Sequence, residues 1–115
     1  RGRSRRNIEA KMDKFFKQQW VAALRSDKFK QGQQMLHSIE DNTYCCIGVL
    51  CEITPAIARI DTEEKTTYNG NRSEMDQDML EYFGLSEGTQ AGLIEMNDNE
   101  GLSFAKIADY IEENL

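Results

Sequence analysis

Hydrophobic residues recur at three- and four-residue steps near the start of the chain, which is the spacing of one face of a helix. The residues on this face are Ile8, Met12, Phe15, Phe16, Trp20, Ala23 and Leu24. The lysines of the segment fall mostly on the opposite side. The pattern predicts a helix over residues 8–25, with Asn7 as the capping residue at its N-terminus.

The spacing changes after the glycine at position 32. Met35, His37 and Ile39 alternate with Leu36 and Ser38, and the turn-forming stretch "EDN" follows. We therefore predict a short β-hairpin with strands over residues 34–39 and 43–46. A helix over residues 46–53 comes next. Pro55 is expected to end that helix and to start a second helical turn over residues 55–60.

The second half of the chain is more polar at first. Residues 61–72 are predicted to form a loop, in which Asn69-Gly70 is a strong turn signal. Ser73 is predicted to cap a helix over residues 74–83 that ends at Gly84. The stretch 86–101 fits either a helix end or a short strand. Ser103 is expected to cap a final helix with the apolar face Phe104, Ile107, Ala108, Ile111 and Leu115.

These elements predict the α+β class, as a mostly helical single domain with a small β-hairpin and about four to five helices. A length of 115 residues fits one domain. We assign residues 1–6 to a basic, flexible start and residues 7–115 to a single globular domain. No apolar run approaches 18 residues and no secretory signal is visible, so we expect no membrane association.

Charge is distributed unevenly along the chain. Residues 1–30 hold ten Lys and Arg against three acids, a net of +7, whereas residues 31–115 hold four against 17, a net of −13. The two parts sum to the total of −6. An acidic body repels nucleic acid and attracts basic protein surfaces. Nucleic-acid binding is therefore not expected of the acidic body, and the segment that suits it is the basic start "RGRSRR".

All three cysteines lie within "TYCCIGVLCEI", residues 43–53. A structural zinc site needs four ligands, commonly from C-x₂-C pairs, but this chain offers C-C-x₄-C and a single histidine. On a helix, Cys46 and Cys51 would point about 140° apart around the axis. We therefore predict no metal and no cofactor. An odd number of cysteines, two of them adjacent, also favours a reducing cytoplasm over a disulfide framework.

Two interpretations of the thiols stay open. They can be small apolar side chains that pack inside the protein. Alternatively Cys45 or Cys46 is a nucleophile, because a helix N-terminus lowers the pKa of a thiol. In that case His37 would be the base and Asn97 or Asp98 would orient it. Papain-like proteases place their histidine after the cysteine, whereas His37 precedes both candidates.

Three blocks carry a resemblance to a known group of proteins. They are "WVAALRSDKFKQG" (20–32), "YCCIGVLCE" (44–52) and "SFAKIADYIEE" (103–113), and they cover about a third of the chain. In this order they resemble a family of small uncharacterised proteins encoded by phages and prophages. The shared pattern runs W-V-x-A-L-R-S, Q-G, C-C-x-G-V-L-C, N-D and S-F-x-x-I-A-D. This chain departs from it at Gln34, where glycine is usual, and at Met96, where leucine is usual.

The resemblance implies a viral origin and the cytoplasm of a bacterial host, but no activity. It also implies that Arg25, Gln31, Asn97 and Asp98 belong together with the cysteine block, as a polar cluster that either acts or holds the fold. We expect a phage-encoded accessory protein that binds a host protein, in host takeover or counter-defence. A cysteine-dependent hydrolase or transferase is the alternative. The sequence leaves the oligomeric state open.

Overall fold

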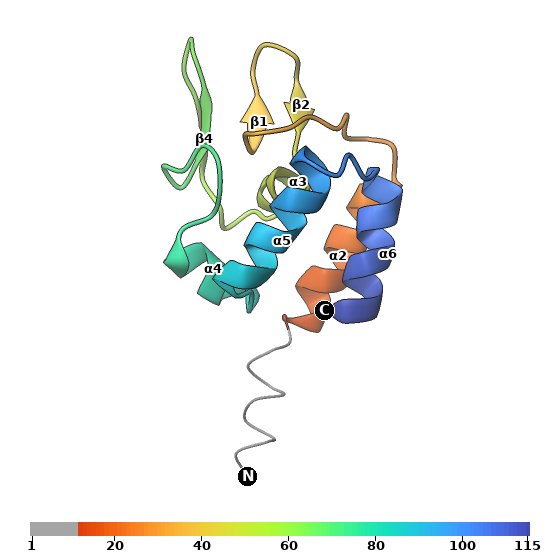
Figure 1. Cartoon of the computed structure of the whole chain (residues 1–115). Coiled ribbons are helices and arrows are strands. Elements are labelled where there is room, and N and C mark those ends of the chain that lie inside the picture. Colours follow the sequence, from red (N-terminus) through yellow and green to blue (C-terminus); the bar gives the residue numbers. More distant parts are fainter. Residues whose placement is uncertain (1–11) are drawn as a thin grey trace.

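A computed structural model describes residues 12–115 and gives, within that range, five helices and two two-stranded antiparallel sheets (Figure 1). The helices are α2 (Lys14–Arg25), α3 (Cys46–Glu52), α4 (Gln77–Phe83), α5 (Glu87–Asp98) and α6 (Phe104–Asn114). The strands are β1 (His37–Ser38), β2 (Thr43–Tyr44), β3 (Arg59–Asp61) and β4 (Thr66–Tyr68). The predicted α+β class is confirmed. The predicted basic start and the cap Asn7 lie outside the described residues.

Helix α2 begins later than the periodicity predicts. The Asp13 side chain accepts hydrogen bonds from the backbone N–H of Phe15 at 2.8 Å and of Phe16 at 3.3 Å, so Asp13 is the N-cap. The predicted apolar face holds for Trp20 and Leu24, which are buried. It fails for Phe15, which is 64% exposed.

The predicted hairpin before the cysteine block is confirmed, with shorter strands. β1 and β2 pair antiparallel, with His37 opposite Tyr44. The predicted helix follows at once as α3, ending one residue before the predicted end. Cys45 caps this helix through its sulfur, which accepts from the Gly48 N–H at 3.4 Å.

Residues 55–60 were predicted to be helical, and this prediction is wrong. The chain forms a second hairpin instead, in which Arg59 of β3 lies opposite Tyr68 of β4. The cause is a partner eleven residues away: the Asn69 side chain accepts from the Ala58 N–H at 2.8 Å, and the Asn69 N–H donates to the Ala58 carbonyl at 2.8 Å. With these groups engaged, the backbone of Ala58 cannot continue a helix.

The three last helices follow local capping chemistry. α4 is capped by Asp76, whose side chain accepts from the Met79 N–H at 3.0 Å, and not by Ser73 as predicted. Gly84 ends it with a φ of 77°, as expected for a left-handed C-terminal residue. The ambiguous stretch after it forms α5, capped by Ser86. The cap Ser103 and the helix α6 agree with the prediction.

Helix α3 lies at the centre of the molecule. It packs against α2 on one side and α5 on the other, while α6 runs alongside α2 (Figure 1). All residues from Cys46 to Cys51 are buried. At Gly48 the helix comes so close to the hairpin that a Cβ atom would overlap the Leu36 carbonyl oxygen. The glycine of the cysteine block is therefore required by this close approach.

Candidate functional site

A buried cluster of side-chain amides connects four segments of the protein. Its centre is Asn97, fully buried near the end of α5. The Asn97 Oδ1 accepts from Gln31 Nε2 at 2.9 Å and from the Cys46 N–H at 3.3 Å. Its Nδ2 donates to the Gly32 carbonyl at 2.8 Å and to Asp98 Oδ1 at 2.9 Å. Asn97 thereby uses the full hydrogen-bonding capacity of its amide.

Gln31 extends the cluster to the start of α6. Its Nε2 donates to the Leu102 carbonyl at 2.8 Å, and its Oε1 accepts from the Phe104 N–H at 3.2 Å. The Gly32 N–H in turn donates to the Tyr44 carbonyl at 2.8 Å, which connects the segment to β2. A network whose members are all paired makes a core rigid. The hydrogen bonds of this amide cluster therefore give Gln31, Asn97 and Asp98 a role in holding the fold.

Arg25 does not join the amide cluster. Its guanidinium pairs with two acids of α6, Asp109 at 2.6 Å and Glu112 at 3.0 Å. These pairs connect α2 to α6 at the surface, and the side chain of Arg25 is more than a third exposed. The resemblance grouped four polar residues, and the structure divides them into the amide cluster and this surface ion pair.

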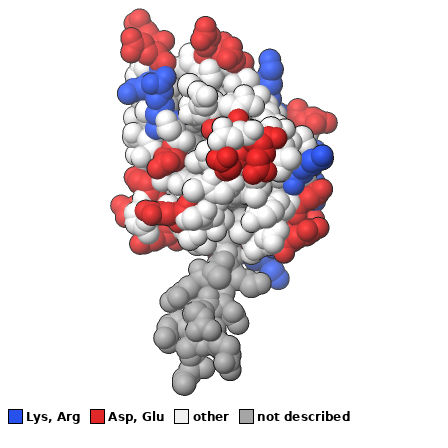
Figure 2. Space-filling model, in the orientation of Figure 1, with Lys and Arg blue, Asp and Glu red and all other residues white. Residues whose placement is uncertain are grey.

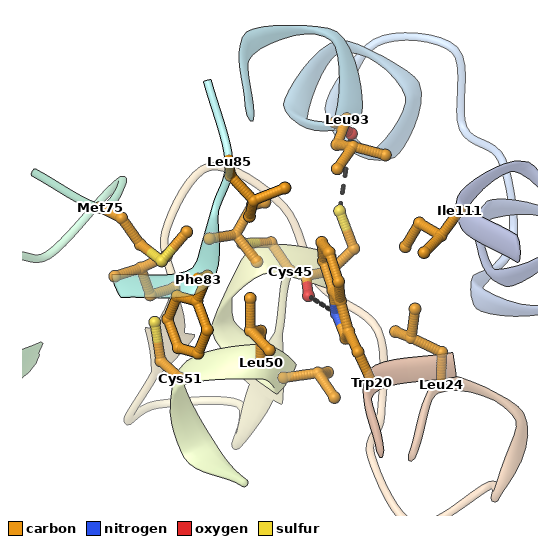
Figure 3. Close-up of a cluster of buried hydrophobic side chains, with 14 of the residues drawn as sticks. Trp20, Leu24, Cys45, Leu50, Cys51, Met75, Phe83, Leu85, Leu93 and Ile111 are labelled. Carbon is orange, nitrogen blue, oxygen red and sulfur yellow. Dashed lines mark hydrogen bonds between the residues drawn. The ribbon is translucent and has the colours of Figure 1, made fainter. Parts of the chain in front are cut away.

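The three thiols lie inside the hydrophobic core (Figure 3). The Cys46 Sγ donates to the Leu93 carbonyl at 3.6 Å, and the Cys46 carbonyl accepts from Trp20 Nε1 at 2.9 Å. The sulfur of Cys45 is engaged as the cap of α3. Cys45 and Cys51 are 3% and 1% exposed. Packing of this kind closes the thiols to solvent.

Burial also decides the acidity of these thiols. It raises the pKa of Cys45 to about 11, against the opposing effect of hydrogen bonds from the Gly48 and Ile47 backbone. It raises the pKa of Cys46 and Cys51 as well. The loss of hydration of a thiolate outweighs the attraction of the helix N-terminus. All three groups are therefore thiols near neutral pH.

His37 is held away from the role of a base for these thiols. Its Nδ1 lies 2.8 Å from Thr66 Oγ1, and its Nε2 lies 2.8 Å from Asn42 Oδ1. The Thr66 hydroxyl donates to Asp61 Oδ1 at 2.9 Å, so it accepts from His37 Nδ1. Asp98 meanwhile accepts from Asn97. The structure does not join Cys45 or Cys46, His37 and Asp98 into one hydrogen-bonded set.

The second hairpin carries a polar network that the sequence did not reveal. Arg59 binds both carboxylate oxygens of Asp61, at 3.0 and 3.1 Å, and Glu52 at 2.9 Å. Tyr68 donates its hydroxyl to the same Glu52 at 2.7 Å. The Arg59 hydrogen bond lowers the pKa of Asp61, and burial raises that of Tyr68. Asp61 and Tyr68 lie in the stretch predicted as a polar loop, whereas Glu52 and Arg59 lie in predicted helical segments, and no local signal paired them.

Two further features bear on the class of site. Among residues 12–115, no group of three or more His, Cys, Asp or Glu side chains is arranged to hold a metal ion. Within the same range no helix is both long and apolar enough to cross a membrane.

Comparison with known proteins gives one match. No curated protein and no solved structure is similar to the chain. The family described as "Domain of unknown function (DUF8296)" matches residues 12–82. The match begins at the first described residue and covers α2, both hairpins, α3 and almost all of α4. Since it spans more than half of the sequence, the chain belongs to this family.

Proposed function

We propose that this protein acts by binding another protein through its acidic surface. The observation that carries the proposal is the charge of the folded part. Residues 12–115 contain nine Lys and Arg and nineteen Asp and Glu, a net charge of −10. Figure 2 shows the acidic side chains in several groups over the visible face, with fewer basic ones between them. Such a surface speeds association with a basic partner and repels nucleic acid.

The proposed partner is a basic protein of a bacterial cell. In the same proposal the chain is a phage-encoded accessory protein in the cytoplasm, where it serves host takeover or counter-defence. A basic nucleic-acid site is one surface that an acidic body of this size can cover. The resemblance of the three sequence blocks supports the origin, and the charge supports the kind of partner.

The alternative, a hydrolase or transferase that uses Cys45 or Cys46, receives less support. A nucleophilic thiol needs access to substrate and a lowered pKa, but both thiols are buried and burial raises both pKa values. Labelling with iodoacetamide discriminates between the binding protein and the cysteine-dependent enzyme. We expect no labelling of the folded protein at pH 8 and labelling of three cysteines in urea. Rapid labelling of Cys45 or Cys46 in the folded protein would favour the enzyme.

Capture from bacterial lysate tests the binding function. The bait is the whole chain, compared with a Glu63→Lys/Glu64→Lys variant, whose two acids are exposed and form no ion pair within the described residues. A matched control is Lys65→Arg, which keeps the charge at the next position. We expect a basic protein that is retained at low salt, released at about 1 M salt and reduced by the charge reversal. A partner indifferent to salt and to the variant would contradict the proposal, as would repeated failure to recover any.

A further inference from the structure

A hollow of about 390 Å³ opens between the segment 30–35 and the β1–β2 hairpin. Besides Gln31, its polar lining consists of Lys30, Gln33, Gln34, Ser38, Asp41 and Thr43. In Figure 1 the segment crosses in front of β2 on its way to β1. The volume lies within the range of about 300–1,000 Å³ that small-molecule sites occupy.

The two charged side chains of this hollow, Lys30 and Asp41, are free to bind a ligand. Neither Lys30 nor Asp41 takes part in an ion pair within residues 12–115, in contrast to Arg25 and Arg59, which each pair with two acids. Thr43 also lines the hollow, and no hydrogen bond joins its hydroxyl to another described residue. The hydroxyl is therefore open to solvent, because every buried side-chain N or O atom of the described residues has a partner. An accessible hydroxyl without an internal partner can donate and accept hydrogen bonds with whatever fills the hollow.

The backbone of the segment is also open to a ligand. Gln34 has a φ of 74°, a left-handed conformation that costs a non-glycine residue free energy. Within the described part of the chain, the N–H groups of Gln33, Gln34 and Met35 donate to no other residue. Below them Gln31 and Gly32 are fixed by the amide cluster. A rigid base therefore presents an irregular loop with unused donors.

The charges and hydrogen-bonding groups of the hollow restrict the chemical class of its ligand. Lys30 can pair with an anionic group of the ligand and Asp41 with a cationic one. The carboxamides of Gln33 and Gln34 and the unpaired backbone N–H groups can form hydrogen bonds with amides. A purely anionic ligand would be repelled by a body with a net charge of −10, but a zwitterion would not. We propose that the hollow binds a short peptide whose two ends are both ionised, with its carboxylate at Lys30 and its amine at Asp41.

Triglycine is the probe that tests this site, because it has two ionised ends and no side chains. It is added to the whole ¹⁵N-labelled protein, and the amide signals of Gln33, Gln34, Met35 and Ser38 are followed by NMR. We expect saturating shifts with a dissociation constant of about 1 mM. N-acetyl-triglycine and triglycine amide each lack one charge, and both are expected to bind about tenfold more weakly.

Matched substitutions assign the two ends. Lys30→Met should weaken triglycine and N-acetyl-triglycine, which both keep the carboxylate, and should leave the binding of triglycine amide, which lacks it, unchanged. Asp41→Asn should weaken triglycine and triglycine amide, which both keep the amine, and should leave the binding of N-acetyl-triglycine unchanged. Lys28→Met and Asp27→Asn remove the same charges from exposed residues outside the lining and should change nothing. Absence of shifts up to about 20 mM, well above the expected dissociation constant, would overturn the proposal. Equal binding of the capped peptides or equal effects of the control variants would overturn it too.

This inference does not depend on the proposed protein partner. The Lys30→Met variant keeps the acidic residues Glu63 and Glu64. The lysate experiment tests those two residues and not Lys30. The two proposals can therefore fail separately.

Discussion

Replacement of Asn97 by alanine tests whether the amide cluster holds the fold. The substitution removes the acceptor of the Cys46 N–H, which is fully buried, and the donor to the half-buried Gly32 carbonyl. Gln31 Nε2 retains its bond to the Leu102 carbonyl. A buried polar group left without a partner costs about 1–3 kcal/mol. With the buried N–H at about 1–3 kcal/mol and the half-buried carbonyl at the lower end of about 1 kcal/mol, the free energy of unfolding should fall by about 2–4 kcal/mol.

Urea unfolding followed by the fluorescence of Trp20 measures this loss. Trp20 is the single tryptophan, it is buried, and its indole is bonded to the Cys46 carbonyl next to the cluster. The control is Asn99→Ala, which removes an exposed amide bonded to Glu95 at 2.8 Å. That change should cost less than about 0.5 kcal/mol. A cost below about 1 kcal/mol for Asn97→Ala would refute the reasoning, because the buried groups would then have found other partners.

A double-variant cycle sharpens the same test. Gln31→Ala leaves the Leu102 carbonyl and the Phe104 N–H without their side-chain partner. Gln31 and Asn97 share one hydrogen bond, so the double variant should lose less stability than the two single variants together. Strict additivity would mean that the bond between the two amides contributes nothing.

Three further predictions concern packing, backbone strain and pH. Gly48→Ala should cost more than about 2 kcal/mol in urea unfolding because the new methyl group overlaps a backbone carbonyl, whereas Gly92→Ala, which faces open space on α5, should gain about 0.5–1 kcal/mol. Gln34→Gly should raise the free energy of unfolding by about 0.5–1 kcal/mol by relieving the left-handed φ, and Gln33→Gly should not raise it. Burial raises the pKa of the Cys45 thiol from 9.0 to about 11, so the folded protein holds its proton more tightly than the unfolded chain does. The contribution of this thiol to stability should therefore be constant below about pH 8 and be lost between pH 9 and pH 11. A flat profile of urea midpoints across that window would contradict the burial of the thiols.

Local chemistry made much of the fold predictable. Gly84 and Ser103 end and begin their helices through contacts within four residues, so their roles could be inferred from the neighbouring sequence. The hairpin before the cysteine block was predictable for the same reason, because strand-forming residues flank a short turn. The stretch 55–60 was not predictable, because its conformation depends on Asn69, which lies beyond an intervening loop.

The sequence by itself determined the α+β class, the hairpin and helix around the cysteines and the acidic charge of the body, since each depends on composition or on near neighbours. Only the tertiary structure decided what the polar residues and thiols do. Gln31 and Asn97 are 66 positions apart and meet because α5 packs over α3. The position of Cys45 at a helix N-terminus favours a thiolate, but burial by distant segments raises its pKa instead. Desolvation is set by everything packed around a group, and no short stretch of sequence contains that information.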